Sequence, residues 1–367
     1  MKNEFIPATG EEGIALCDDT DFALYRRPDE THYTLVADAG GAASLPDDAS
    51  LEGERGFLVA PFLYGTAAPS GLPTLLIRPH TCTQAPVPDG GGFSLSATPG
   101  DAEDERMAYH RSFGRAYRRF STSSCHKFVL SRCHDVRLHD ALDGHGLTSL
   151  FFKACRLYPH SYVALWRTQA GGTWLTATPE TLLRRDACGW HTMALAGTMD
   201  GSDPRSATPD GWSAKNREEQ AYVSRYIAER LRPLAWTWQA SATRPTDAAG
   251  MRHLRTDFTF TTADNVRLRT LLEALHPTPA VCGWPAGEAL AAILDAEPHA
   301  RRYYAGFSGP LALRGTTAFY VTLRCMELTA TAARLYAGGG ILKESREEDE
   351  WQETCRKMQP MLRLFSS

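Results

Sequence analysis

Acidic residues lie on the apolar faces of two expected helices. In segment 212–232, apolar residues recur at four-residue spacing from Val223 to Leu231, and Glu219 lies four residues before Val223 on the same face. Glu218 is turned about 100° away and should face solvent. Glu219 therefore points toward the core, where a single carboxylate would be expected to cap the helix or pair with a cation.

The last expected helix, 347–365, repeats this arrangement. Glu350, Glu353 and Lys357 share one face at spacings of three and four residues. Carboxylates that meet inside a protein repel each other unless a cation neutralises them. Because hard oxygen ligands without thiols favour magnesium, the pattern indicates a Mg²⁺ site, provided that the two helices meet. Pro360 predicts a kink in this helix.

Three consecutive glycines, Gly338 to Gly340, follow an expected strand and precede this helix. We expect them to close the strand, which would leave unhindered backbone N–H groups near a helix start, where anions are favoured. The alternative for a glycine run alone is a flexible turn.

Composition narrows the class of protein. A chain of 367 residues with 43% hydrophobic content can bury a sizeable core, and a net charge of -4 argues against broad binding to nucleic acid or to anionic membrane. The nine cysteines form no C-x-x-C pair, and the first ten residues lack the apolar segment of a signal peptide. Apolar runs such as 57–63 are too short to cross a bilayer. We therefore expect a cytoplasmic monomer with reduced thiols, and the oligomeric state stays open.

The order of expected elements favours an α+β fold. The first hundred residues are weakly patterned, with irregular loops expected over 67–100. Helices are expected at 103–120, 147–157, 212–232, 266–275, 288–294 and 347–365. Strands are expected at 127–132, 162–167, 173–178, 190–195, 258–262, 318–328 and 333–337, and those between 162 and 195 should form a meander. We predict one large domain, 1–367, with extended antiparallel sheets and helices packed outside.

Several short motifs occur in a fixed order along the chain, and together they resemble the chorismate-utilising enzyme family. They are Lys127-Phe-Val-Leu-Ser-Arg132, Ala177-Thr-Pro-Glu180, Leu195-Ala-Gly-Thr198, Ser213-Ala-Lys-Asn-Arg-Glu-Glu219, His276-Pro-Thr-Pro-Ala280, Glu297-Pro298, Tyr304-Ala-Gly306, Val321-Thr-Leu-Arg-Cys325, Leu335-Tyr-Ala-Gly-Gly-Gly-Ile341 and Glu350-Trp-Gln-Glu-Thr354. Over 1–100 the resemblance is loose, and only 56–62 matches. The resemblance therefore implies that 101–367 is the catalytic part.

Within this family the sequence is most similar to the isochorismate synthases. Lys127 resembles the water-activating base of the members that use water, and 276–285 resembles the isochorismate type. Salicylate synthase remains an alternative, with the same base and acid followed by loss of pyruvate. Anthranilate synthase is less expected because Lys127 is present. The alternative that is not an enzyme is a protein that binds chorismate without converting it.

The resemblance implies a reversible, magnesium-dependent isomerisation of chorismate to isochorismate. Lys127 would be the general base, which requires its neutral amine, and Glu180 the general acid, which requires its protonated carboxyl. Glu219 and Glu353 would bind magnesium, with Glu350 nearby. The product could feed menaquinone, siderophore or salicylate biosynthesis, and these alternatives stay open. The implied substrate-binding residues are Gly197, Thr198, His253, Ala280, Val281, Tyr304, Leu323, Arg324, Tyr336, Gly338, Gly339, Gly340 and Lys357.

Overall fold

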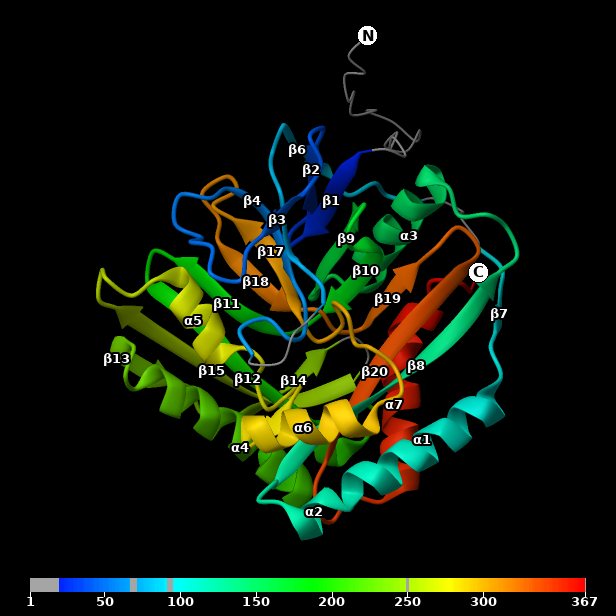
Figure 1. The fold of residues 1–367 in the computed structure, drawn as a ribbon, viewed down its shortest axis with the longest axis vertical. Coiled ribbons are helices and arrows are strands. Elements are labelled where there is room, and N and C mark those ends of the chain that lie inside the picture. Colours follow the sequence, from blue (N-terminus) through cyan, green and yellow to red (C-terminus); the bar gives the residue numbers. More distant parts are fainter. Residues whose placement is uncertain (1–19, 67–70, 91–94, 249–250, 367) are drawn as a thin grey trace.

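The computed structural model describes residues 20–66, 71–90, 95–248 and 251–366, which build two large antiparallel sheets with helices around them (Figure 1). The first sheet has the order β16 (Gly283–Trp284), β8 (Lys127–Leu138), β20 (Ala332–Ile341), β19 (Cys325–Leu328), β10 (Gly172–Thr178), β9 (Tyr162–Thr168), β1 (Asp21–Arg26), β2 (His32–Asp38) and β6 (Thr81–Pro86), with β7 (Ala97–Pro99) paired to β8. The second has the order β13 (Ala235–Ala240), β15 (Met251–Thr262), β12 (Gly189–Asp200), β11 (Thr181–Asp186), β18 (Ala318–Val321), β17 (Phe307–Leu311), β4 (Gly56–Ala60), β5 (Thr74–Ile77) and β3 (Ala43–Leu45), with β14 (Arg244–Ala248) paired to β15.

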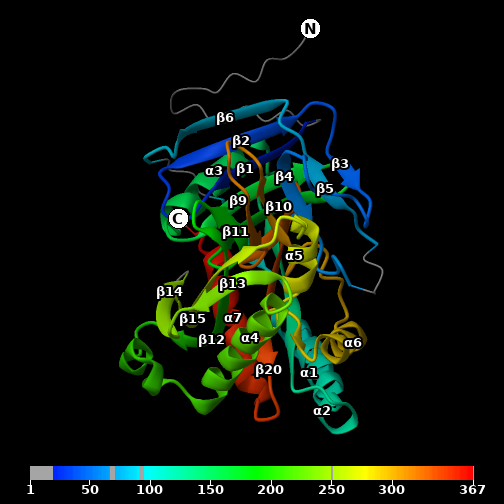
Figure 2. The same ribbon diagram turned by 90° about the vertical axis from the view of Figure 1, so that its left-hand side faces the viewer.

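Helices cover the outside of this pair of sheets, as the turned view in Figure 2 also shows. They are α1 (Ala102–Tyr117), α2 (Arg119–Thr122), α3 (Gly144–Leu157), α4 (Ala214–Leu231), α5 (Leu268–Leu275), α6 (Ala286–Ala296) and α7 (Glu347–Leu362), with short 3₁₀ turns at Pro204–Ala207 and Pro209–Gly211. None of the described helices is long and apolar enough to cross a bilayer. The predicted α+β class, with antiparallel sheets and outer helices, is confirmed.

Two apolar cores hold the layers together, and β9 contributes to both. Ala164 and Trp166 enter the core between the sheets, whereas Val163 and Leu165 face the core beneath α3 and α7. Successive side chains of a strand point to opposite faces, so a strand covered on both sides must be apolar throughout. The continuous burial of β9 fixes the first sheet between the second sheet and its helices.

Among the described strands the chain changes from one sheet to the other six times, and two of these crossings carry charged residues predicted for the site. These two lie between β10 and β11 at residues 179–180, and between β18 and β19 at residues 322–324. The expectation of one strand over 318–328 was therefore wrong. Of the expected meander, the antiparallel pair of β9 and β10 is confirmed, but β12 lies in the second sheet, where it pairs with β11 and β15. Glu180 and Arg324 lie at these crossings, where the sheets meet.

Other expectations also need correction. The glycines do not close a strand: Gly338, Gly339 and Gly340 lie inside β20 and pair in register with β8. Three short strands, β5, β6 and β7, occupy the described part of 67–100, where irregular loops were expected. Helix α7 continues through Pro360 to Leu362.

Candidate active site

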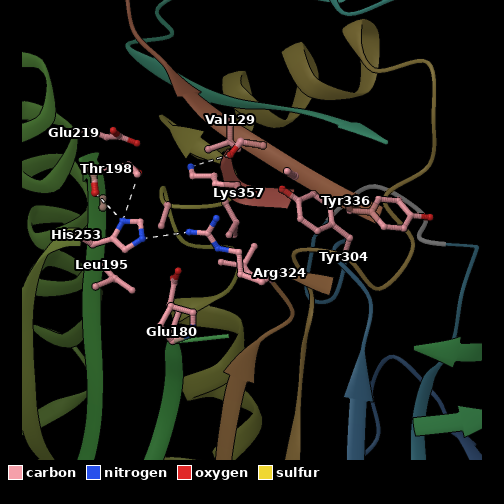
Figure 3. A pocket seen from close by; sticks show the side chains of 18 residues that line it. Val129, Glu180, Leu195, Thr198, Glu219, His253, Tyr304, Arg324, Tyr336 and Lys357 are labelled. Atoms are coloured by element: carbon pink, nitrogen blue, oxygen red, sulfur yellow. Dashed lines mark hydrogen bonds between the residues drawn. The ribbon is translucent and has the colours of Figure 1, made fainter. Parts of the chain in front are cut away.

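A partly open cavity lies beside these two crossings (Figure 3). Strands β12, β15 and β20 and helices α4 and α7 contribute to its wall. Of the residues predicted from the sequence, it is lined by Glu180, Gly197, Thr198, Glu219, His253, Ala280, Val281, Tyr304, Leu323, Arg324, Tyr336, Gly338 and Lys357. The wall also includes residues that the sequence did not single out: Val129, Pro179, Leu195, Ala196 and Ala337.

Glu180 presents its carboxyl group to this cavity from the crossing between β10 and β11 (Figure 3). Its backbone carbonyl accepts a hydrogen bond from Val321 N–H at 3.0 Å, which fixes the crossing to the neighbouring strand. Only 3% of the residue is exposed. Burial raises the pKa of Glu180 to about 8, against the opposing charges of Lys127, Lys357 and Arg324. The carboxyl group is therefore mostly protonated at neutral pH and can donate a proton.

Arg324 reaches the cavity from the crossing between β18 and β19. Its backbone has a φ of 45°, and its carbonyl accepts from Ala177 N–H at 3.0 Å. A left-handed backbone at a non-glycine residue is uncommon and has to be held by its surroundings. The guanidinium is buried, burial lowers its pKa to about 10, and its Nη1 has no hydrogen-bond partner in the described structure. That donor is available to an anionic ligand.

His253 orients this guanidinium. Its Nδ1 lies 2.8 Å from the carbonyl oxygen of Gly197, and its Nε2 lies 3.2 Å from Arg324 Nη2. Burial, followed by the charges of Arg324 and Lys357, lowers the pKa of His253 to about 3. The ring is therefore neutral, with its proton on Nδ1 and its Nε2 accepting from Arg324.

Lys127 does not line the cavity directly. It is 0% exposed, and its Nζ lies 3.0 Å from Glu219 Oε1, a contact close enough for an ion pair but not aligned as a hydrogen bond. Glu219, which does line the cavity, is buried on α4, whereas its neighbour Glu218 is exposed. The prediction that Glu219 faces the interior and Glu218 faces solvent is confirmed.

The carboxylates of α7 each contact a lysine. Glu350 Oε1 forms an ion pair with Lys215 of α4, and Glu353 Oε1 lies 2.6 Å from Lys357 Nζ. Burial, followed by the charge of Glu353, raises the pKa of Glu350 to about 7. Burial acts in the same sense on Glu353, but Lys357 and Lys215 outweigh it and lower the pKa of Glu353 to about 2. The helices α4 and α7 therefore meet through charged side chains, and Lys215 is a member of this cluster that the sequence did not single out.

The glycines of β20 give these side chains room. A methyl group at Gly340 would collide with Glu219 Oε1, and one at Gly339 would lie 3.1 Å from Glu350 Oε2. Strand β19 pairs with β20 only as far as Tyr336, so the later residues of β20 have no neighbour on that side among the described strands. Lys357 Nζ donates there to the carbonyl of Gly338 at 2.9 Å. Gly338 lines the cavity, whereas Gly339 and Gly340 lie behind its lining.

The acidic residues suit a hard divalent cation by their chemistry. Glu219, Glu350 and Glu353 offer only carboxylate oxygens, and Glu350 Oε2 is buried without a hydrogen bond of normal distance and angle. Within the described residues, however, no three acidic, histidine or cysteine side chains converge around one point as metal ligands do. Each of the three carboxylates is instead held by a lysine.

A buried ion pair supports the opposite wall of the cavity. Arg301 donates to the carbonyl oxygens of Val281 and Val129, each at 2.7 Å, and Arg301 Nη2 lies 2.6 Å from Glu297 Oε1. Ser131 N–H also donates to Glu297 Oε1 at 2.7 Å. The pair thereby ties the loop after α5 to strand β8, which positions the two valines that line the cavity.

Comparisons with known proteins identify the family of this chain. Residues 94–366 match the family described as chorismate binding enzyme. The chain is 30% identical over 282 residues to isochorismate synthase EntC of Escherichia coli, covering 74% of this chain and 70% of EntC. The structure of the 2,3-dihydroxybenzoate-specific isochorismate synthase DhbC from Bacillus anthracis has a TM-score of 0.78 at 26% identity, covering 94% of this chain and 96% of DhbC. Anthranilate synthase component I from Streptococcus pneumoniae shares the fold, with a TM-score of 0.69 at 16% identity, covering 96% of this chain and 95% of that protein. The chain therefore belongs to the chorismate-binding enzyme family.

Proposed function

We propose that this enzyme is an isochorismate synthase, which converts chorismate reversibly to isochorismate. In this reaction a water oxygen adds to one ring carbon and the original hydroxyl group leaves another. The observation that carries the proposal is Glu180, a buried carboxyl group with a pKa of about 8 that faces a cavity rich in positive charge. Such a group stays protonated at neutral pH and can protonate a departing hydroxyl. The relatives named isochorismate synthase support the same assignment.

Lys127 is the base in this proposal and Glu180 the acid. In its amine form Lys127 would take a proton from the attacking water, and Glu180 would give its proton to the leaving hydroxyl group, which departs as water. Support for this role is positional: Lys127 lies beside Glu219, one of the residues that line the cavity. Two proton transfers of opposite direction leave the ring with the same composition, so the reaction can run both ways.

Arg324 and Lys357 would bind the carboxylates of chorismate, a dianion. The unpartnered Nη1 of Arg324 supports this, because a carboxylate oxygen would satisfy it. Neutral His253 holds the guanidinium in place through its Nε2. Tyr304 and Tyr336, whose rings stack 5.4 Å apart, form an apolar wall for the ring.

Glu219, Glu353 and Glu350 would hold Mg²⁺. Bound magnesium would neutralise these carboxylates, hold the ring carboxylate of chorismate and draw electron density toward it. The donor chemistry and the buried, unpartnered oxygen of Glu350 support this assignment.

The test is product analysis by chromatography after incubation with chorismate and Mg²⁺, with and without ammonium and with excess chelator. We expect a mixture of chorismate and isochorismate, no effect of ammonium, and no turnover in chelator. Glu219→Ala should abolish turnover, whereas the matched variant Glu218→Ala should not, because only Glu219 faces the interior. Stoichiometric pyruvate with salicylate would indicate a salicylate synthase, anthranilate with ammonium an anthranilate synthase, and binding without turnover a silent chorismate-binding protein.

A further inference from the structure

Lys215 occupies an unfavourable position on its own helix. It lies in the first turn of α4, directly after Ala214 and close to the N-cap Ser213. The N-terminus of a helix carries partial positive charge, so a lysine there is destabilising unless an anion compensates for it. The anion is Glu350 of α7, with which the Lys215 ammonium forms an ion pair. The side chain of Glu350 is 1% exposed and that of Lys215 25%, so the pair joins a buried carboxylate to a cation at the edge of solvent.

The carboxylate of Glu350 is only half satisfied by this pair. Its Oε1 contacts Lys215, whereas its Oε2 is buried and makes no hydrogen bond of normal geometry. A buried carboxyl oxygen that lacks a hydrogen bond of normal geometry is costly. The backbone opposite carries no side chain: a methyl group at Gly339 would lie 3.1 Å from Glu350 Oε2 and 3.8 Å from Glu353 Oε1. The absence of a side chain at Gly339 thus gives the two carboxylates room against β20.

The other two lysines of the cluster already have a use in the proposed reaction. Lys127, which contacts Glu219, is the proposed base, and Lys357, which contacts Glu353, is a proposed substrate ligand. Lys215 lines no part of the cavity. Its charge therefore acts on the acidic cluster alone.

We propose that Lys215 is the counter-cation of Glu350 in the metal-free enzyme and competes with the divalent cation for that carboxylate. This inference rests on the proposed magnesium site. Without metal, Lys215 offsets the repulsion between Glu350 and Glu353 and so keeps α4 and α7 together. A positive charge within a few ångströms of a bound cation weakens the binding of that cation. The affinity for Mg²⁺ is therefore lower with Lys215 present than it would be with a neutral residue at this position. Lys215 is in this sense a positioning residue that does not touch substrate.

The test measures Mg²⁺ binding in the absence of chorismate by isothermal titration calorimetry, together with thermal denaturation monitored by circular dichroism. For Lys215→Met we expect Mg²⁺ affinity to rise by about tenfold or more, because the interaction of two charges in contact near a protein surface exceeds the free energy of one tenfold step. The metal-free variant should melt at a lower temperature than wild type, and Mg²⁺ should raise its melting temperature by more. Lys215→Arg, which keeps the charge, should resemble wild type. Lys343→Met, which removes an exposed lysine, is the matched control and should change neither quantity.

A double variant keeps the proposal testable if Lys215→Met alone is too unstable to titrate. In Lys215→Met/Glu350→Gln both partners are neutral, so the metal-free protein should recover stability and lose the gain in Mg²⁺ affinity. The role of Lys215 would be overturned if Lys215→Met bound Mg²⁺ no more tightly than wild type. It would also be overturned if the double variant were no more stable than Lys215→Met. Wild-type protein that binds no Mg²⁺ would overturn the proposed magnesium site itself, and the two failures are thereby distinguished.

Discussion

The protonation of Glu180 depends on its burial at the crossing between β10 and β11. Three nearby cations favour its ionised form, yet burial outweighs them and the pKa is about 8. A neutral carboxyl in such a place can donate a proton at neutral pH, whereas a solvated glutamate would already have lost it. The chemistry at this residue is therefore a property of its position, which no neighbouring residue in the sequence reveals.

This position predicts how the rate depends on pH. The acid form of Glu180 is populated below its pKa, so kcat should fall as the pH rises through about 8. Glu180→Gln should lose most of its kcat at every pH, because the amide cannot donate an acidic proton. Initial rates across pH, with circular dichroism to verify the fold, make the measurement. A rate that increases through about pH 8 would remove Glu180 from the role of acid.

Lys127 is the second residue at which the mechanism can be tested. Lys127→Met keeps the length of a fully buried side chain but removes the amine, so the fold should survive. Loss of a general base should lower kcat by about a hundredfold to ten-thousandfold. Chorismate affinity, measured by calorimetry, should change much less. If binding weakens while kcat stays near wild type, Lys127 serves to neutralise the substrate and not to activate water.

At the scale of helices and strands, the sequence predicted which helix residues face the interior. It did not predict where the chain crosses from one sheet to the other. The 3.6-residue period is a local property, so Glu219 could be assigned to the interior and Glu218 to solvent before the structure was available. Segment 318–328 is apolar over most of its length and contains no glycine or proline, so it gave no sign that the chain changes sheets at 322–324. The bend there is imposed by tertiary contacts such as the hydrogen bond from Ala177 to Arg324.

The ion pair of Lys215 could likewise not be predicted from the sequence. Its unfavourable place in the first turn of α4 was visible in the sequence, but its partner Glu350 lies 135 residues away. Only the docking of α4 on α7 joins them. The glycines of β20 could be recognised as unusual, yet their purpose depends on which side chains approach the strand from the two helices.

The glycine of β20 nearest to α4 gives a prediction at this scale. Gly340→Ala places a methyl group against Glu219 Oε1 and 3.0 Å from Lys127 Cε, both buried. Overpacking of this kind costs about 1–3 kcal/mol, and the displaced carboxylate should reduce activity. Gly114→Ala is the matched control, because Gly114 lies inside α1 with open space around it and should gain up to about 1 kcal/mol. Urea denaturation and initial rates measure both effects, and equal stability and activity in the two variants would contradict the packing described for β20.

At the scale of the whole molecule, the fold concentrates charge where its two sheets and two of its helices meet. Segments from Val129 to Lys357 contribute to the cavity, so most of the span of the family match is needed to build it. Anthranilate synthase component I shares this architecture, so the fold alone does not determine the nucleophile. In our proposal the distinction between water and ammonia comes from residues in or near the cavity, and Lys127, which contacts the lining residue Glu219, is the one on which the assignment depends.

The most direct test of this assignment follows the oxygen atom. Chorismate and Mg²⁺ are incubated with the enzyme in water labelled with heavy oxygen, and the separated products are examined by mass spectrometry. Water addition with loss of the original hydroxyl predicts isochorismate that carries one solvent oxygen on its ring. Because the reaction is reversible, chorismate recovered at equilibrium should also become labelled. Isochorismate without solvent oxygen, or turnover that yields no isochorismate, would contradict the account.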